Sequence, residues 1–433
     1  MALVVTLTTA GAGAGAAGSG VDAVGDIGDV GVVGGKGASL GELTRAGIAV
    51  PPGFVVTVEA FAAAMAAVDP SGAHRASVEA LGAGDLAGIA RTAARLRALV
   101  TEAPLPAEVA SAISAGYAAL GADLDVAVRS SATVEDSAEA SFAGLQDTYL
   151  GVSGAPAVLG CVRRCWASLY NDESVAYRRR LGLPEDGVAM AVVVQRMVAP
   201  RAAGVMFTRS PVTGDRSVVA IEGTWGLGSA LVSGDVTPDS WVISKVTGEI
   251  TSRRVSPKAK VHLPIQNGRV TPPAPSPAAL GGQDGIAAGT AADPGAGAPA
   301  AGGPAAGRAA GTAAAPSELG WVTVRDTPAE LRDAPCLTDD EIRALAAVAR
   351  RVEAHYGTPQ DIEWAVLHAP PSPAAGAPGA AGVSGAPGAS AESRVVLLQS
   401  RPETVWAARE MTPAGAPKAR PADHVLALFG KPL

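Results

Sequence analysis

The sequence predicts an α+β protein, because apolar runs with strand character alternate with segments of helical periodicity. Runs rich in Val and Ile and bounded by Gly, Pro or Ser are typical of strands; they lie within residues 49–57, 123–131, 187–198, 202–211 and 216–223. Residues 156–182 and 337–357 carry apolar side chains three and four positions apart and end in glycine, as helices often do. A chain of 433 residues has room for roughly two or three domains.

A further strand is expected at residues 358–366, where two acidic residues lie two positions apart. Successive side chains of an extended strand point to opposite faces. Asp361 and Glu363 therefore share one face, while Ile362 and Trp364 point to the other. One face of this strand is expected to be acidic and the other to be part of a core.

Residues 394–406 have the same design, since Gln399 and Arg401 share one face and Val396 and Leu398 lie opposite. If the two strands pair, acids, amide and guanidinium meet on one surface. Carboxylate and amide oxygens suit a divalent metal, and a neighbouring guanidinium suits phosphate. A cross-strand salt bridge on a solvated sheet face explains this stretch equally well when it is taken alone.

The composition excludes several classes of protein. A net charge of −7 argues against general nucleic-acid binding. No apolar run is long enough to predict a transmembrane helix, and residues 1–20 lack a basic region, so we expect a floppy extension there rather than a signal peptide. Cys161, Cys165 and Cys336 predict buried thiols rather than disulfides, although the first two could be metal ligands. A cytoplasmic protein is expected.

Two segments, 271–316 and 369–392, are rich in Ala, Gly and Pro and have almost no large apolar side chains. Such segments cannot offset the entropy cost of ordering, so we expect disordered insertions. The second joins the two polar strands, whose ends can stay close because the cost of loop closure rises slowly with length. The tail, 407–433, has enough apolar residues for one short helix.

The first motif that could carry chemistry is "VGGKGASLGEL", in which glycines surround Lys36. Ser39 and Glu42 have the spacing of a capping box, which predicts a short helix ending at Gly47. A lysine in a glycine loop ahead of a helix is well placed for phosphate oxygens. The spacing is not that of a Walker A loop. A plain glycine turn before a helix remains the alternative.

The second motif is "VAVRSSATVEDS", in which a strand leads Arg129 into a long loop of small residues. A guanidinium at a strand end, beside hydroxyls and flexible backbone, could clamp a triphosphate. Pairing of Arg129 with Glu135 or Asp136 on a surface loop is the alternative.

The third motif begins with "VVVQRMV" and continues to "VVAIEG". Gln195 and Met197, at the end of an apolar strand, could present an amide and backbone groups to a purine beside an apolar wall. Glu222 could reach a ribose or a metal. A core methionine and a glutamate at a strand end are the alternatives.

Taken together, "VRSSAT", "SFAG", "PQDIEW" and "QSRP", in this order, resemble the ATP-binding domain of the phosphoenolpyruvate synthase and pyruvate phosphate dikinase family. That family includes rifamycin phosphotransferases and the ATP-binding subunit of phenylphosphate synthase. The resemblance covers about 30–265 and 318–406. It implies an ATP-grasp fold, in which two subdomains, here 21–190 and 191–406, clasp ATP.

The resemblance also implies where the phosphates bind. Lys36, Arg129 and Arg401 match phosphate ligands that offset charge during the reaction. Gly144 and Thr148 match parts of a loop that covers the phosphates. Three cations and one loop are thus expected around the triphosphate.

The remaining implied contacts concern the base and the metal. Gln195 matches the adenine contact, and Glu363 and Gln399 match the Mg²⁺ ligands. Glu222 is expected to contact ATP as well, and Asp361 is expected to lie behind the metal ligands. The resemblance thus turns the paired-strand pattern into a predicted site for Mg-ATP.

Full-length members of this family pass phosphate to a histidine on a swivelling domain, within a motif like Thr-Cys/Ser-His-Ala-Ala. None of the histidines present lies in such a motif; they are His74, His262, His355, His368 and His424. We therefore expect an ATP-dependent phosphotransferase component that acts on a histidine of a separate partner protein and yields AMP and phosphate overall. A non-catalytic ATP-sensing module is the alternative, and the intact phosphate and metal ligands speak against it.

Overall fold

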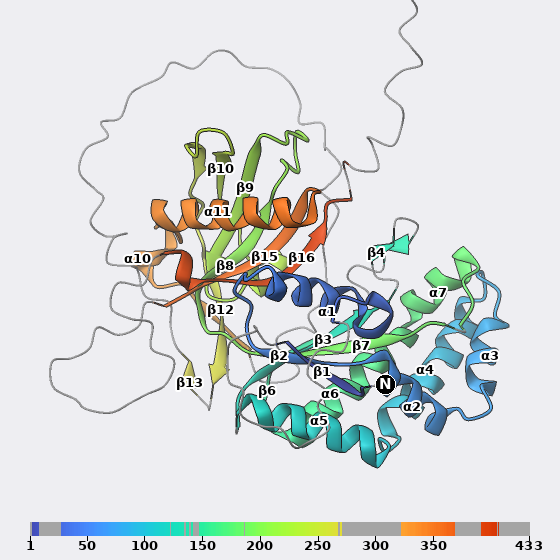
Figure 1. Cartoon of the computed structure of the whole chain (residues 1–433). Coiled ribbons are helices and arrows are strands. Elements are labelled where there is room, and N and C mark those ends of the chain that lie inside the picture. Colours follow the sequence, from blue (N-terminus) through green and yellow to red (C-terminus); the bar gives the residue numbers. More distant parts are fainter. Residues whose placement is uncertain are drawn as a thin grey trace, which may run out of the picture.

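The computed structural model contains two antiparallel β-sheets with helices packed against each (Figure 1). It describes residues 2–7, 27–121, 123–133, 136–137, 140–141, 147–185, 187–266, 269–270, 322–368, 391–404 and 406. The predicted α+β class is confirmed. The expected insertion 271–316, nearly all of 369–392, and the tail 407–433 lie outside the described residues.

The first sheet has the order β1-β2-β7-β3-β6. Its strands are β1 (Val4–Leu7), β2 (Gly53–Val56), β7 (Met190–Arg196), β3 (Val126–Ala132) and β6 (Thr148–Val152). The two-residue strands β4 (Asp136–Ser137) and β5 (Ala140–Ser141) pair only with each other. The strands at 49–57, 123–131 and 187–198 are confirmed.

Two predictions about the first sheet were wrong. Residues 4–7 belong to the stretch expected to be a floppy extension, yet they pair with β2 along their whole length and are largely buried. The predicted subdomain boundary between 190 and 191 falls inside β7, which pairs with both β2 and β3. The first unit therefore extends through Arg196, because hydrogen bonding of that strand completes the sheet.

Helices pack on both faces of the first sheet. They are α1 (Val30–Arg45), α2 (Val58–Val68), α3 (Ala73–Glu79), α4 (Leu86–Glu102), α5 (Ala107–Leu120), α6 (Ala155–Ala167) and α7 (Asp172–Leu181), with a 3₁₀ turn, η1 (Ser168–Tyr170), between the last two. Helix α1 lies where the two sheets meet, and α5 and α6 cover the far face (Figure 1).

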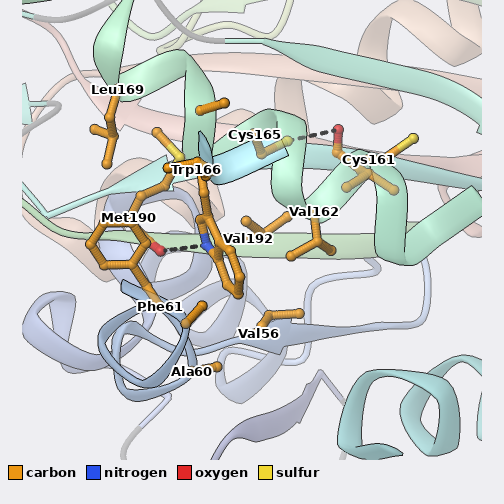
Figure 2. Packing of buried hydrophobic residues seen from close by; sticks show 14 of the residues in the cluster. Val56, Ala60, Phe61, Cys161, Val162, Cys165, Trp166, Leu169, Met190 and Val192 are labelled. Atoms are coloured by element: carbon orange, nitrogen blue, oxygen red, sulfur yellow. Dashed lines mark hydrogen bonds between the residues drawn. The ribbon is translucent and has the colours of Figure 1, made fainter. Parts of the chain in front are cut away.

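The core of this unit centres on Trp166, whose indole N–H donates to the carbonyl of Met190 at 3.0 Å (Figure 2). The edge of Phe61 meets the Trp166 ring with centroids 5.8 Å apart. Cys161 and Cys165 pack in the same cluster, and burial raises the pKa of both thiols. All three cysteines are free and buried, as predicted.

The second sheet has the order β11-β10-β9-β8-β15-β16. Its strands are β8 (Pro200–Phe207), β9 (Val218–Trp225), β10 (Asp239–Ser244), β11 (Ile250–Arg254), β15 (Gln360–Leu367) and β16 (Val395–Pro402). A smaller sheet joins β13 (Arg269–Val270), β12 (Lys260–Gln266) and β14 (Val322–Asp326). The short helices are α8 (Ser229–Val232), α10 (Ala329–Arg332) and the 3₁₀ turn η2 (Glu392–Arg394).

Helix α11 (Asp339–Tyr356) covers one face of the second sheet (Figure 1). Its apolar side chains Ile342, Leu345 and Val352 meet Trp364 and others in one buried cluster. Since Trp364 points toward this helix, the other face of β15 is left for polar residues.

The start of α11 depends on a capping box. Thr338 Oγ1 accepts from the Glu341 N–H, and Glu341 Oε2 accepts from the Thr338 N–H at 2.9 Å. Thr338→Ala is expected to lower the free energy of unfolding by about 1 kcal/mol. Thr338→Ser should keep most of that stability, because its hydroxyl can accept the same bond. Urea titrations of the three proteins check this, and equal loss in both variants would contradict the capping role.

None of the helices in the described part of the chain combines the length and the apolar character that crossing a membrane requires.

Candidate functional site: a cleft between two sheets

A cleft of about 1330 Å³, counted with its open mouth, lies between the two sheets. Its walls come from β3, β6 and β7 of the first sheet, from β8, β15 and β16 of the second, and from α1 and α8. Of the predicted site residues, those that line it are Lys36, Arg129, Thr148, Gln195, Glu363, Gln399 and Arg401. The fold thus brings seven predicted residues from distant parts of the sequence together.

Arg129 joins the two sheets across this cleft. Its Nη2 donates to Glu363 Oε2 at 2.9 Å and to Gln399 Oε1 at 3.0 Å, and its Nη1 donates to the Leu398 carbonyl at 2.7 Å. Only 13% of the Arg129 side chain is exposed, against 40% for Glu363. The described contacts of this guanidinium therefore reach the second sheet; Glu135 and the Asp136 side chain, the alternative partners, lie outside the described residues.

The predicted pairing of the two polar strands is confirmed, with Asp361 opposite Arg401 and Glu363 opposite Gln399. Beyond Glu363 the register shifts by one residue, which is a β-bulge at Leu398. The bulge is why one expectation was wrong: Leu398 lines the cleft instead of facing away from Gln399.

The bulge also changes which residues of β16 enter the core. Val395 and Leu397 are buried in the cluster under α11, whereas Val396 was expected to lie on the core face and is only partly buried. A one-residue insertion reverses the alternation of the strand after it. A simple count of alternating residues along β16 therefore assigns the residues before Leu398 to the wrong face of the strand.

Lys36 is positioned by a kink in α1. Gly34 has φ 69° and ψ 174°, a backbone conformation that is essentially restricted to glycine. Ser131 fastens the kink to β3, since its Oγ accepts from the Gly37 N–H at 3.0 Å and donates to the Val33 carbonyl at 2.8 Å. Lys36 therefore stands on the helical turn after the kink and lines the cleft.

The predicted capping box in α1 was wrong. The helix begins at Val30 behind Asp29, so Ser39 lies in its interior, and the Ser39 hydroxyl donates to the Ser400 carbonyl at 2.5 Å. The Glu42 carboxylate instead accepts from Arg45, and it lies 3.2 Å from the His355 ring. The Ser39 bond joins α1 to β16 and the Glu42–His355 contact joins it to α11, so these residues hold α1 in place rather than start a helix.

Gln195 and Thr148 lie on the cleft face of the first sheet. The Gln195 side chain is nearly fully buried, and its Nε2 donates to the Pro51 carbonyl at 3.0 Å. Thr148 stands directly opposite Arg129 in the β3–β6 pair. Met197, predicted with Gln195 to present backbone groups and an amide to a purine, also lines the cleft.

One predicted residue, Glu222, is not brought into the cleft. Glu222 shares the sheet face of Glu363, because Val205 stands opposite both, but it lies two strands away and outside the cleft lining. Burial raises the pKa of Glu222, and Arg254 partly offsets this. Gly144 lies outside the described residues. The predicted roles of these two residues remain predictions.

Asp361 lies beside Arg401, with 3.8 Å between its Oδ2 and the Arg401 Nε. Its other carboxylate oxygen is buried without a hydrogen-bond partner among the described residues. Burial raises the pKa of this carboxyl to about 6, while Arg401 lowers it and Glu403 raises it further. A carboxyl so placed retains its proton well above the usual pH range.

This pKa predicts a pH-dependent stability. The folded protein holds the Asp361 proton up to pH about 6, whereas an ordinary carboxyl releases it near 3.8, so wild-type stability falls as the pH rises through that window. Asp361→Asn is therefore expected to raise the free energy of unfolding by on the order of 2 kcal/mol at pH 7 and to give no gain at pH 4. Unfolding titrations at both pH values check this, and a gain equal at both would contradict it.

The segment 227–232, which follows β9, lines the cleft but was not predicted from the sequence. Leu227, Leu231 and Val232 supply apolar lining to the cleft, and Ser229 adds a hydroxyl. The available signal was the pair of glycines in "WGLGS", since Gly226 has φ +70° and allows the sharp turn that brings the segment over β8. The cleft thus has an apolar part as well as a cationic part.

Similarity to known proteins shows the family of this chain. Residues 30–279 and 308–420 match the family described as the pyruvate phosphate dikinase AMP/ATP-binding domain. A rifampicin phosphotransferase of Streptomyces sp. is 41% identical over 333 residues, which are 76% of this chain and 32% of that protein. A probable phosphoenolpyruvate synthase of Staphylothermus marinus is 36% identical over 383 residues, or 87% of this chain and 40% of that protein.

A probable phosphoenolpyruvate synthase of Methanothermobacter thermautotrophicus is 38% identical over 338 residues, or 77% of this chain and 42% of that protein. The chain therefore spans about a third to two fifths of the length of these relatives. The matched ranges contain all of the predicted site residues. The chain belongs to the family of the pyruvate phosphate dikinase AMP/ATP-binding domain, whose members include proteins named as phosphoenolpyruvate synthases and rifampicin phosphotransferases.

Proposed function

We propose that this chain, with an ATP-grasp fold, is the Mg-ATP-binding part of a phosphoenolpyruvate-synthase-like phosphotransferase. It binds ATP in the cleft between its two sheets and supports transfer of a phosphoryl or pyrophosphoryl group to a histidine of a separate protein. ATP ends as AMP and phosphate. The family membership and the names of the relatives support a phosphotransferase role.

The observation that carries this proposal is the convergence of three cationic side chains with a carboxylate and an amide in one cleft. Lys36 comes from α1, Arg129 from the first sheet, and Arg401 from the second, and all three line the cleft. Cations from separate elements can surround a chain of phosphates from several sides. Such a setting stabilises charge that develops on phosphate oxygens during transfer.

The residues present fit a magnesium ion. Glu363 Oε2 and Gln399 Oε1 lie close enough together to accept from the same atom of a cation, Arg129 Nη2. The described residues contain no group of three or more His, Cys, Asp and Glu side chains arranged to hold a metal. Magnesium in nucleotide sites commonly uses one or two protein ligands and completes its shell with phosphates and water. When bound, the ion would offset phosphate charge.

Arg129 then has two sets of partners. In the structure its guanidinium donates to Glu363, Gln399 and the Leu398 carbonyl. With Mg-ATP, Glu363 and Gln399 would hold the metal through their side-chain oxygens, and the guanidinium would be available to phosphate. Arg401, paired with Asp361 across the strands, contributes charge beside the same oxygens.

The accepting histidine must reach the cleft from elsewhere. Among the described histidines, His74, His262, His355 and His368 do not line the cleft. His355 instead packs edge-on against Tyr356 and contacts Glu42, which supports a structural role. These positions favour an acceptor histidine outside the described residues, and we assign it to a separate partner protein.

The test incubates the purified chain with Mg²⁺ and ATP, alone and with a candidate histidine-domain protein, and follows AMP by chromatography. AMP is expected only when both proteins are present, with phosphate on the partner's histidine. Arg401→Ala should remove the activity, and Arg401→Lys should restore only part of it, because lysine keeps the charge but loses the planar fork. Tight ATP binding without turnover under any pairing would instead favour an ATP-sensing module.

A further inference from the structure

A chain of polar side chains leads from the cleft wall through a buried histidine to the surface. Ser229 Oγ, which lines the cleft, lies 3.0 Å from His262 Nδ1, and His262 Nε2 lies 2.9 Å from Asp235 Oδ2. The His262 side chain is fully buried, whereas 48% of the Asp235 side chain is exposed. The phosphotransferase function proposed above uses none of these residues.

The same histidine also holds the backbone next to Ser229. The Leu227 N–H donates to the His262 carbonyl at 2.9 Å, and Gly226 forms an isolated parallel bridge with this residue. A Cβ at Gly226 would lie 2.4 Å from the His262 carbonyl oxygen, so only glycine allows this approach. His262 thus contacts the Ser229 side chain directly and also holds the backbone two residues before it.

The direction of the hydrogen bonds follows from the acceptor at the surface. Asp235 also accepts from the Ser233 hydroxyl at 2.8 Å, and that bond lowers the pKa of its carboxyl, so the group is ionised. His262 Nε2 must therefore carry a proton and donate it. Burial lowers the pKa of His262 more than Asp235 raises it, so the ring is neutral and its Nδ1 can only accept.

It follows that the Ser229 hydroxyl donates its proton to His262 Nδ1 and presents only oxygen lone pairs to the cleft. The arrangement differs from a hydrolytic serine triad, in which histidine meets serine through Nε2 and the acid through Nδ1. Here the two nitrogens have the opposite partners. The histidine orients the serine as an acceptor rather than activating it as a nucleophile.

Ser229 stands in the apolar part of the cleft. Leu231 and Val232 follow it in α8, and Met197 and Val198 lie on the segment that connects the two sheets. Of the cationic side chains that line the cleft, Lys36, Arg129 and Arg401 come from α1, β3 and β16, and Arg196 lies at the end of β7 beside Met197. The first three converge and suit phosphates. A nucleotide whose phosphates meet those cations therefore places its nucleoside against the apolar wall that carries Ser229.

We propose that Ser229, oriented by His262, is a specificity-determining residue that accepts a hydrogen bond from a donor group on the nucleoside. The proposal rests on the proposed function, because it needs the phosphates to occupy the cationic part of the cleft. Three donor groups on the nucleoside of ATP have this chemistry: the exocyclic amine of adenine and the 2′ and 3′ hydroxyls of the ribose. A base that presents a carbonyl in place of the amine would meet the lone pairs of Ser229 and be disfavoured.

The experiment measures dissociation constants by calorimetry, with Mg²⁺, for wild type and Ser229→Ala. The ligands are ATP, purine riboside triphosphate, which lacks the amine, and the 2′-deoxy and 3′-deoxy forms of ATP. Wild type is expected to lose about 5- to 10-fold in affinity for one analogue, and Ser229→Ala should bind that analogue and ATP equally. The identity of the analogue distinguishes the amine from a ribose hydroxyl.

Positioning by His262 is tested with two variants. His262→Phe removes the acceptor for Ser229 and should lose the same selectivity, whereas His262→Asn can offer its amide oxygen near the Nδ1 position and should regain part of it. Thermal unfolding identifies a variant that fails to fold. Ser77→Ala is the matched control, since Ser77 is exposed on α3, and it should leave every dissociation constant unchanged.

The outcomes separate this inference from the proposed function. Equal binding of all four nucleotides by wild type, or selectivity that persists in Ser229→Ala, would overturn the role of Ser229 while leaving the ATP site in place. Failure of wild type to bind any of the four would refute the proposed function and this inference with it.

Discussion

Glu363→Gln is expected to lower the rate of ATP-dependent phosphoryl transfer roughly 10²- to 10³-fold. The substitution keeps the size of the side chain and an oxygen that can accept from Arg129, but removes the negative charge that would hold a magnesium ion. The Glu363 carboxylate is also the charged partner of Arg129 across the cleft, at 2.9 Å. The expected loss lies in the rate of transfer more than in the affinity for ATP, because the cations that bind phosphate remain.

The measurement is single-turnover transfer to the partner's histidine, with ATP affinity determined separately by calorimetry. Glu249→Gln is the matched control, since Glu249 is an exposed acid that precedes β11 and does not line the cleft. A rate within 3-fold of wild type for Glu363→Gln, on the order of what a lost surface contact costs, would contradict a role in metal binding.

Gly34→Ala is expected to lower the free energy of unfolding by roughly 3 to 5 kcal/mol and to abolish tight ATP binding. The residue has φ 69° and ψ 174°, which side chains rarely adopt, and an added Cβ would lie 2.0 Å from the Ser131 carbonyl oxygen. Relief of that clash requires α1 to move away from β3, and Lys36 would leave the cleft with it.

Gly47→Ala is the control that separates the cost of a positive φ from the cost of a clash between the added Cβ and its neighbours. Gly47 also has a positive φ, of +66°, but nothing lies within 4 Å of a Cβ added there. That variant should lose only about 1 kcal/mol, the cost of the left-handed conformation, and should bind ATP normally. Chemical denaturation and calorimetry of both variants check the pair. Equal losses of stability would show that the approach of Gly34 to Ser131 is unimportant.

The sequence predicted the polar residues of the site well, because the side chains of β15 and of β16 from Gln399 onward alternate without interruption. Asp361 and Glu363 share a face as expected, and their partners Arg401 and Gln399 stand opposite them. The prediction failed at Leu398, where a bulge adds one residue to β16. A bulge forms when one strand adapts to its neighbours, so the residues of that strand alone give little sign of it.

Long-range contacts explain the other failures. Residues 4–7 form a strand because β2 offers a free edge, and this can be seen only once the sheet is assembled. Ser39 has the spacing of a helix cap, yet its hydroxyl bonds to Ser400, 361 positions away. The polar chain from Ser229 to Asp235 was not predicted for the same reason, because its histidine, His262, lies in β12, away from α8 in the sequence.

A crystal structure of the chain with Mg²⁺ and a non-hydrolysable ATP analogue would show directly whether the cleft is the Mg-ATP site. We expect the triphosphate among Lys36, Arg129 and Arg401, a metal on Glu363 and Gln399, and loss of the 2.9 Å contact between Arg129 and Glu363. Nucleotide bound outside this cleft, or bound within it while Arg129 keeps its contacts with Glu363 and Gln399 and no metal is present, would contradict this expectation.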